Sequence, residues 1–211
     1  MKSGKPAALD GTEGERVAAC VARLKLKHVV ITSVDRDDLA DLGAAHWVRV
    51  IEAVKKGNPM TTMETLIPDF QGRKELVQQI IEAHPQVVSH NLETVQRLSK
   101  KVRRVATYKT SMGVVGQIAN SGLIAKSGIM LGFGECREEV LQTMDDLREV
   151  GCSVLTIGQY LQPTVSNIKV TEYIEPSVFE EYGRIGREKG FTHVESGALV
   201  RSSYHAERHI R

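Results

Sequence analysis

The sequence predicts an α/β fold in which parallel strands and helices alternate to form a partial barrel. Short apolar runs rich in β-branched residues recur along the 211 residues, and most are followed by a stretch with helical spacing of apolar positions. The runs do not alternate with polar residues, which is typical of strands buried on both faces. Repeated strand–helix units build a parallel sheet. Six strands are too few for a complete eight-stranded barrel, and a flavodoxin-like open sheet is the alternative.

Six segments are expected to be strands. In chain order they are 28–32, a second run that ends with 64–67, then 86–89, 123–131, 153–157 and a weaker segment at 193–200. The first reads HVVIT and the fifth SVLTI, and both are compact and apolar. Pro68 directly follows the second segment, where a strand would end.

Helices are expected between these strands, over 13–24, 44–56, 73–83, 138–150 and 176–189. The first places Cys20 on an apolar stripe of spacing i, i+3, i+4, i+7, so Cys20 is expected in the core. Gly151 is placed to cap the fourth helix, and Pro176 opens the last. The segment 110–122 is a weaker helix because it contains two glycines.

The composition limits the classes of partner. Lys and Arg total 28 against 26 Asp and Glu, so the net charge of +2 indicates no general affinity for polyanions. No apolar run reaches the roughly 18 residues of a membrane span, and the first ten residues do not form a signal peptide. We therefore expect one domain over residues 1–211, with neither a nucleic acid nor a membrane as partner.

Three cysteines lie far apart at positions 20, 136 and 152, which indicates a reducing compartment and no disulfide scaffold. Cys152 is expected in the core. Cys136, beside Glu135 at a helix start, is the one placed where a thiolate could be stabilised. His205 and His209 have the i, i+4 spacing of a metal-binding pair, but two exposed histidines are the favoured interpretation.

Polar residues follow several predicted strands, and a barrel brings such loops to one rim, where active sites are built. Asp35 lies in an acidic loop after the first strand, where Arg36 indicates local salt bridging and a solvated loop is the simpler interpretation. Asn91 and Glu93 follow the third strand, where they could bind a ligand hydroxyl or cap the next helix. The Gly132–Glu135 loop lets backbone approach an anion or a ribose, although a tight turn explains it equally well.

Six stretches together carry a more specific signal. They read VVITSVDRDDLADLGAAHW at 29–47, LIPDFQGR at 66–73, HNLETVQRL at 90–98, KSGIMLGFGE at 126–135, LTIGQYLQPT at 155–164 and VRSSYHAE at 200–207. In this order and spacing they closely resemble lipoyl synthase, a family of radical S-adenosylmethionine enzymes. The resemblance covers nearly the whole chain.

The resemblance implies a partial (β/α)6 barrel of the radical S-adenosylmethionine kind. It also implies the insertion of sulfur at C6 and C8 of an octanoyl group on a lipoyl carrier domain. The cofactors implied are S-adenosylmethionine and two 4Fe-4S clusters. One cluster cleaves S-adenosylmethionine reductively, with flavodoxin or ferredoxin as electron donor, and the second is consumed as the sulfur source.

The resemblance also implies roles for individual residues. Ser203 matches the serine that ligates an iron of the second cluster, and Arg201 is expected against that cluster, so 200–207 is a C-terminal cluster segment. Both are implied as catalytic residues. The residues implied to lie around S-adenosylmethionine are Ser33, Asp35, Arg36, Asn91, Glu93, Gly132, Gly134 and Glu135.

The sequence departs from the family in its cysteines. The family's two N-terminal motifs, CxxxCxxC and CxxxxCxxxxxC, are both absent, and three scattered cysteines cannot hold two clusters. Gly4-Lys5-Pro6 resembles the segment that follows CxxxCxxC. We therefore expect a fragment without its first strand and cluster segment, with an unpaired sheet edge, no clusters and no activity by itself.

Two other functions stay open at this point. The chain could be a non-catalytic barrel module that binds S-adenosylmethionine or a lipoyl domain. It could also be a barrel enzyme that uses acid–base chemistry at Asp35, Glu93 or Glu135.

Overall fold

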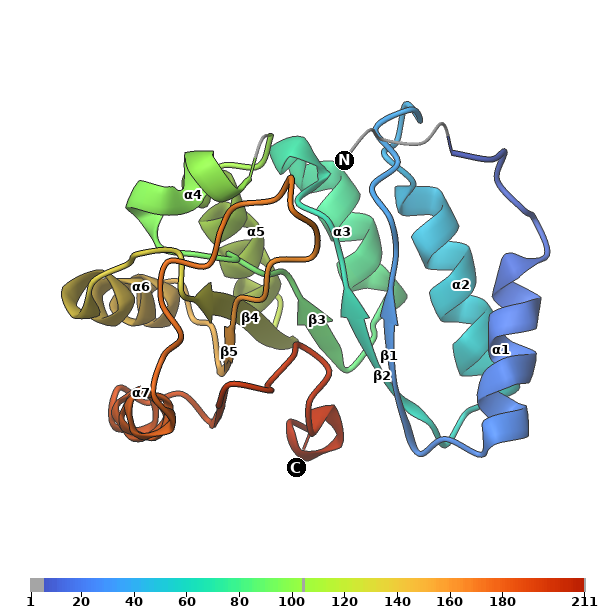
Figure 1. Cartoon of the computed structure of the whole chain (residues 1–211). Helices are drawn as coiled ribbons and strands as arrows, with labels where there is room; N and C mark the ends of the chain where they lie inside the picture. The colour runs from blue at the N-terminus through green and yellow to red at the C-terminus, as the bar shows by residue number, and fades with distance from the viewer. Residues whose placement is uncertain (1–5, 104, 211) are drawn as a thin grey trace.

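The computed structural model describes residues 6–103 and 105–210, so Gly4 and Lys5 of the N-terminal motif lie outside the described residues. Six parallel strands form one sheet in the order β1-β2-β3-β4-β5-β6 (Figure 1). Their bounds are β1 (His28–Thr32), β2 (Thr62–Leu66), β3 (Val87–Ser89), β4 (Ile124–Leu131), β5 (Val154–Gln159) and β6 (His193–Ser196). The predicted parallel α/β fold is confirmed.

The sheet is open. Within the described residues, β1 pairs with β2 alone and β6 with β5 alone, so these two strands form its edges. Figure 1 shows helices around the outside of the strands, whereas the 160–175 loop and the C-terminal segment lie on the near side. This arrangement is that of a partial barrel.

Seven helices are present in the described part of the chain. They are α1 (Glu13–Leu24), α2 (Ala44–Gly57), α3 (Lys74–Ala83), α4 (Gln96–Val102), α5 (Tyr108–Asn120), α6 (Arg137–Glu149) and α7 (Pro176–Glu188), with short 3-10 turns η1 (Phe70–Gly72) and η2 (Ala206–Arg208). Each of the five firmly expected helices is found within one residue of its predicted bounds. None of the helices described is long and apolar enough to cross a membrane.

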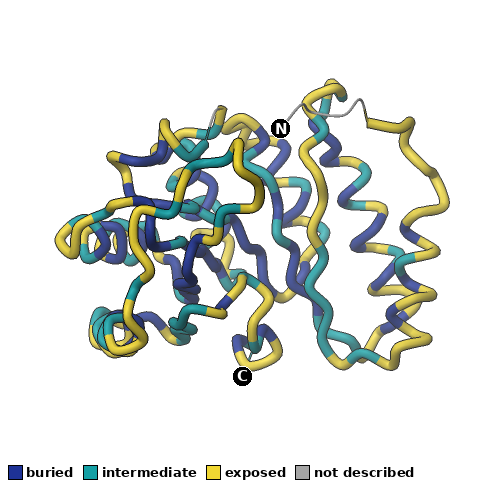
Figure 2. Tube along the Cα trace, viewed as in Figure 1, coloured by how far each residue is buried: buried dark blue, intermediate teal, exposed yellow. Residues whose placement is uncertain are grey.

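Burial follows the patterns that predict the elements. Every residue of β5 is buried, as expected for a strand covered on both faces. In α3 the stripe Leu76, Val77, Ile80 and Ile81 faces the core, whereas the other residues before Ala83 are polar. Figure 2 shows the same alternation in the flanking helices, with dark blue segments toward the sheet and yellow ones outward.

Three expectations about single residues and segments need revision. Cys20 is exposed, although it was expected in the core, because the side of α1 that packs on α2 is formed by Gly14, Ala18 and Val21. His209 is 2% exposed, not a surface residue. The weak helix at 110–122 is the regular helix α5, which begins two residues earlier because the Thr107 hydroxyl accepts a hydrogen bond from the Thr110 amide at 3.1 Å. Cys152 is buried as predicted.

Candidate active site

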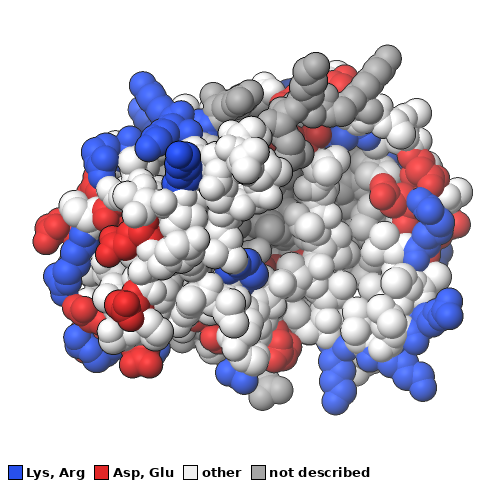
Figure 3. All heavy atoms as spheres, in the orientation of Figure 1, with Lys and Arg blue, Asp and Glu red and all other residues white. Residues whose placement is uncertain are grey.

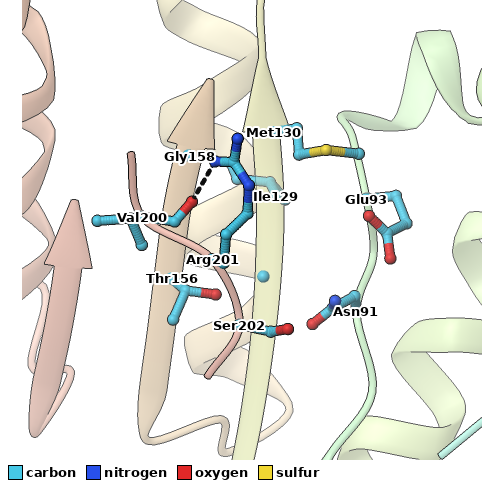
Figure 4. Close-up of a pocket in the computed structure, with 10 residues that line it drawn as sticks. Asn91, Glu93, Ile129, Met130, Thr156, Gly158, Val200, Arg201 and Ser202 are labelled. Carbon is cyan, nitrogen blue, oxygen red and sulfur yellow. Dashed lines mark hydrogen bonds between the residues drawn. The ribbon is translucent and has the colours of Figure 1, made fainter. Parts of the chain in front are cut away.

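A cavity of about 190 Å³ opens where the C-terminal segment crosses the sheet (Figure 4). Its wall comes from the loop after β3, from β4 and β5, and from residues 200–202. The lining residues are Asn91, Glu93, Gly128, Ile129, Met130, Thr156, Gly158, Val200, Arg201 and Ser202. Three residues implied by the family resemblance, Asn91, Glu93 and Arg201, therefore meet in one place.

Glu93 is fixed by a backbone bridge to β4. Its amide donates to the Gly128 carbonyl at 3.0 Å, and its carbonyl accepts from the Met130 amide at 2.9 Å. The residue has a φ of +68°, in the left-handed region that non-glycine residues rarely adopt. Burial raises the pKa of the Glu93 carboxyl, and a hydrogen bond with Asn91 opposes that effect.

Asn91 leaves an acceptor free inside the cavity wall. Its Oδ1 atom is buried, and it finds no hydrogen-bond partner among the described residues. A buried amide oxygen without a donor is costly, so a ligand hydroxyl or amine fits here. Figure 4 shows Asn91 and Glu93 on one side of the cavity and Arg201 and Ser202 on the other.

Two glycines give the cavity backbone walls. A Cβ atom at Gly128 would lie 2.5 Å from the Thr156 hydroxyl and 3.0 Å from Asn91 Oδ1. A Cβ atom at Gly158 would collide with the carbonyl oxygen of Val200. Both positions therefore exclude a side chain and let the neighbouring groups approach the sheet closely.

Arg201 faces the cavity from the C-terminal segment. Its guanidinium donates to the carbonyl of Val200 at 2.7 Å, which folds the side chain back along its own backbone. Ser203, two residues further along, is exposed and does not line the cavity.

The loop after β1 lines other cavities. Ser33 accepts a hydrogen bond from the Trp47 indole at 3.1 Å, and Arg36 pairs with Asp38 at 2.8 Å, the local salt bridge expected for this loop. Asp35 lies in a separate acidic hollow with Asp37 and Asp69, where burial and these two carboxylates raise its pKa. These side chains share the C-terminal rim of the sheet with Asn91 but do not line its cavity.

The Gly132–Glu135 loop satisfies its own polar groups. The Glu135 carboxylate accepts hydrogen bonds from the amides of Gly132 at 2.6 Å and Phe133 at 3.0 Å. Gly134 accepts a hydrogen bond at its carbonyl from Arg97 at 2.8 Å. Gly132, Gly134 and Glu135 follow β4 at the same rim but do not line the cavity, so their cofactor role stays a prediction.

Sequence reasoning missed seven lining residues: Gly128, Ile129, Met130, Thr156, Gly158, Val200 and Ser202. All seven lie inside the stretches that carry the family resemblance, at 126–135, 155–164 and 200–207. Their relation to Asn91 depends on which strands are neighbours, and that information is not in any local pattern.

The comparisons with known proteins agree with this geometry. Residues 2–147 match the model of the radical SAM superfamily. Lipoyl synthase of Treponema denticola is 64% identical over 210 residues, which are 100% of this chain and 72% of that protein. Mitochondrial lipoyl synthase of Nematostella vectensis is 54% identical over 211 residues, 100% of this chain and 72% of that protein.

This chain belongs to the lipoyl synthase family. Relatives that are 54–64% identical over the whole chain are lipoyl synthases, which are radical S-adenosylmethionine enzymes. The alternative of a non-catalytic binding module is therefore not favoured. The fold is shared more widely. HydG, a maturase of the [FeFe]-hydrogenase, superposes with a TM-score of 0.71 at 12% identity over 99% of this chain and 49% of that chain. Methylornithine synthase superposes with a TM-score of 0.65 at 11% identity, over 92% of this chain and 64% of that chain.

The two kinds of family cofactor fit this lipoyl synthase chain differently. S-adenosylmethionine fits the polar lining of the cavity, because Asn91 Oδ1 is buried and finds no donor among the described residues, as an acceptor for a ligand hydroxyl would be. A 4Fe-4S cluster does not fit the described residues. They contain no group of three metal-ligating side chains, and burial raises the pKa of Cys152 to about 12, far from a thiolate.

Proposed function

We propose that this chain forms the barrel of a lipoyl synthase, which inserts sulfur at C6 and C8 of an octanoyl group on a lipoyl carrier domain. The observation that carries the proposal is the 64% identity with a lipoyl synthase over the whole chain. In this family S-adenosylmethionine supplies the adenosyl group whose radical removes hydrogen from the octanoyl chain. The residues of this chain bind and orient that adenosyl group.

The adenosyl group is assigned to the cavity between β4, β5 and the C-terminal segment. Asn91 Oδ1 is the acceptor for a ribose hydroxyl, because it is buried and without a donor among the described residues. Glu93 lies beside it, with a carboxyl group whose pKa burial raises. Gly128 lets Asn91 approach β4 closely, which fixes where this acceptor lies in the cavity wall.

Ser203 and Arg201 are assigned to the sulfur-donating step by the family resemblance. Among the described residues the Ser203 hydroxyl makes no hydrogen bond, whereas its carbonyl accepts one from the Ala206 amide at 3.3 Å. The hydroxyl is therefore free for another partner, and a side-chain cap of the following turn is not observed. We also propose a second 4Fe-4S cluster in the complete site, a flavodoxin or ferredoxin as electron donor, and a cytoplasmic location.

The binding of S-adenosylmethionine tests this assignment directly. Isothermal titration of the chain with S-adenosylmethionine should give saturable binding, which Asn91→Ala weakens by about tenfold because one buried hydrogen bond is lost. Asn120→Ala is the matched control, since Asn120 is exposed at the end of α5. Equal affinity of the two variants would remove Asn91 from the site.

A further inference from the structure

A buried ion pair lies between β2 and β4. Lys126 Nζ is 2.7 Å and 2.8 Å from the two carboxylate oxygens of Glu64, and both side chains are 0% exposed. Strand β3 separates the two parent strands, so the pair bridges it across the sheet. Burial lowers the pKa of Lys126, and the carboxylate of Glu64 opposes that effect. An ion pair without water contact needs a complete set of hydrogen bonds to be tolerated.

The third hydrogen bond of Lys126 leaves the sheet. Its ammonium donates to the carbonyl oxygen of Ser202 at 2.5 Å. The Ser202 carbonyl belongs to the peptide bond between Ser202 and Ser203. This hydrogen bond therefore fixes the backbone between Arg201, which lines the cavity, and Ser203. An ammonium has three donors, and here Glu64 and Ser202 use all of them.

The same segment is held close to the sheet at a second point. The carbonyl of Val200 packs against Gly158 of β5, where a larger residue would collide with it. Together the two contacts place residues 200–202 as one wall of the cavity, opposite Asn91 and Glu93. The other hydrogen bonds of this segment, such as that from the Tyr204 amide to the Arg201 carbonyl at 2.9 Å, are internal and do not tie it to the barrel.

We propose that Lys126, held by Glu64, is a positioning residue that sets the Arg201–Ser203 segment against the cavity and thereby completes the ligand site. Lys126 does not touch the ligand in this role. It acts through the Ser202 carbonyl on the two side chains that flank it. The effect on ligand affinity rests on the proposed function, whereas the effect on the segment itself does not.

Three variants separate positioning from general stability. Lys126→Met removes the donor to Ser202. The double change Glu64→Leu with Lys126→Met also removes the carboxylate that would otherwise stay buried and unpaired. Lys101→Met is the matched control, because it makes the same change at an exposed lysine in the last turn of α4.

Hydrogen–deuterium exchange read by mass spectrometry is the primary measurement, made on the whole chain without ligand. In both variants that lack Lys126, peptides over 200–206 should exchange about tenfold faster or more, while peptides over β3 and β4 keep their protection. Lys101→Met should leave residues 200–206 protected. Unchanged exchange at 200–206 without Lys126, or an increase spread equally over the sheet, would overturn the proposal.

Titration with S-adenosylmethionine is the second measurement. The affinity of the double variant should fall about tenfold or more, and that of Lys101→Met should stay near the parent value. If exchange changes as expected and the affinity of the double variant does not, the segment is anchored by Lys126 but the claim that it completes the ligand site is wrong. If the parent chain fails to bind, the proposed function is at fault, and exchange alone decides whether Lys126 positions the segment.

Discussion

At the scale of single residues, His90 shows how burial controls a charge next to the site. Its Nδ1 atom donates to the Ile67 carbonyl at 2.9 Å, and its Nε2 atom accepts from the Ser111 hydroxyl at 2.9 Å. The Arg103 guanidinium donates to the same hydroxyl oxygen at 2.5 Å, which leaves the hydroxyl proton for His90. The imidazole is therefore held neutral, and burial lowers its pKa to about 4.

This arrangement predicts a loss of stability in mild acid. The folded pKa of His90 is below the value of 6.5 for a free imidazole, so its contribution is present above pH 6.5 and disappears as the pH falls toward about 4. The free energy of unfolding at pH 4 should be lower than at pH 7 by up to about 3 kcal/mol from this group. Urea titrations of the parent and of His90→Gln, which cannot be protonated, measure the difference. An equal pH dependence in both would contradict the assignment.

Ser203 gives a second residue-scale prediction. We consider a chimera in which this chain replaces the aligned 72% of Treponema denticola lipoyl synthase. In it Ser203→Ala should lower lipoyl product at least about tenfold while deoxyadenosine still forms, because the loss of a ligand disables the sulfur-donating step alone. Ser202→Ala is the control, and its effect should be milder. Deoxyadenosine and the lipoyl product should be quantified separately. If Ser203→Ala makes as much lipoyl product as the parent chimera, Ser203 is not a cluster ligand.

At the scale of elements, local patterns locate most of the fold. Strand β1 and helix α1 match their predicted bounds, because the apolar run and the helical stripe are both unbroken. Helix α4 was not predicted. It has seven residues, Lys100 and Lys101 occupy its last turn, and its N-cap is Val95, which offers no side-chain oxygen. Figure 3 shows positively charged side chains gathered over this part of the surface.

The turn after β4 yields a prediction about packing. Gly132 has a φ of +110°, and a Cβ atom there would collide with the Gln159 side chain and lie 2.7 Å from the Glu172 carbonyl. Gly132→Ala should therefore destabilise the chain by about 1–3 kcal/mol. Gly113→Ala in α5 meets nothing within 4 Å and should stabilise it by about 0.5–1 kcal/mol. Chemical denaturation measures both, and a neutral Gly132→Ala would show that this turn tolerates a side chain.

At the scale of the whole molecule, the alternation of elements predicts the fold class, but the cavity could not be read from it. Asn91 and Ser202 are far apart in the chain and meet because β3, β4 and β5 are neighbours and the C-terminal segment folds back over them. The rim itself was predictable, since every candidate from Ser33 to Glu135 follows the end of a parallel strand. Which of these residues share a cavity depends on the curvature of the sheet, and local patterns do not encode it.

The family resemblance assigns roles to residues for which the residue patterns leave two interpretations open. The physical interpretation of Asn91 and Glu93 leaves helix capping open, and the structure shows instead that Val95 is the N-cap of α4 and that Glu93 bridges to β4. For Glu135 the simpler interpretation, a closed turn, describes the observed hydrogen bonds. The patterns thus supplied candidates, and long-range packing separated those that line the cavity from those that close a loop.

The central claim is that this chain is the barrel of a lipoyl synthase, and the chimera tests it most directly. The chimera should be incubated with an octanoylated lipoyl carrier domain, S-adenosylmethionine and a reductant, and the carrier analysed by intact-mass spectrometry. The account predicts a carrier whose octanoyl group has gained two sulfur atoms, in an amount comparable to that from the Treponema denticola enzyme. A chimera that folds and cleaves S-adenosylmethionine but leaves the octanoyl group without sulfur would contradict it.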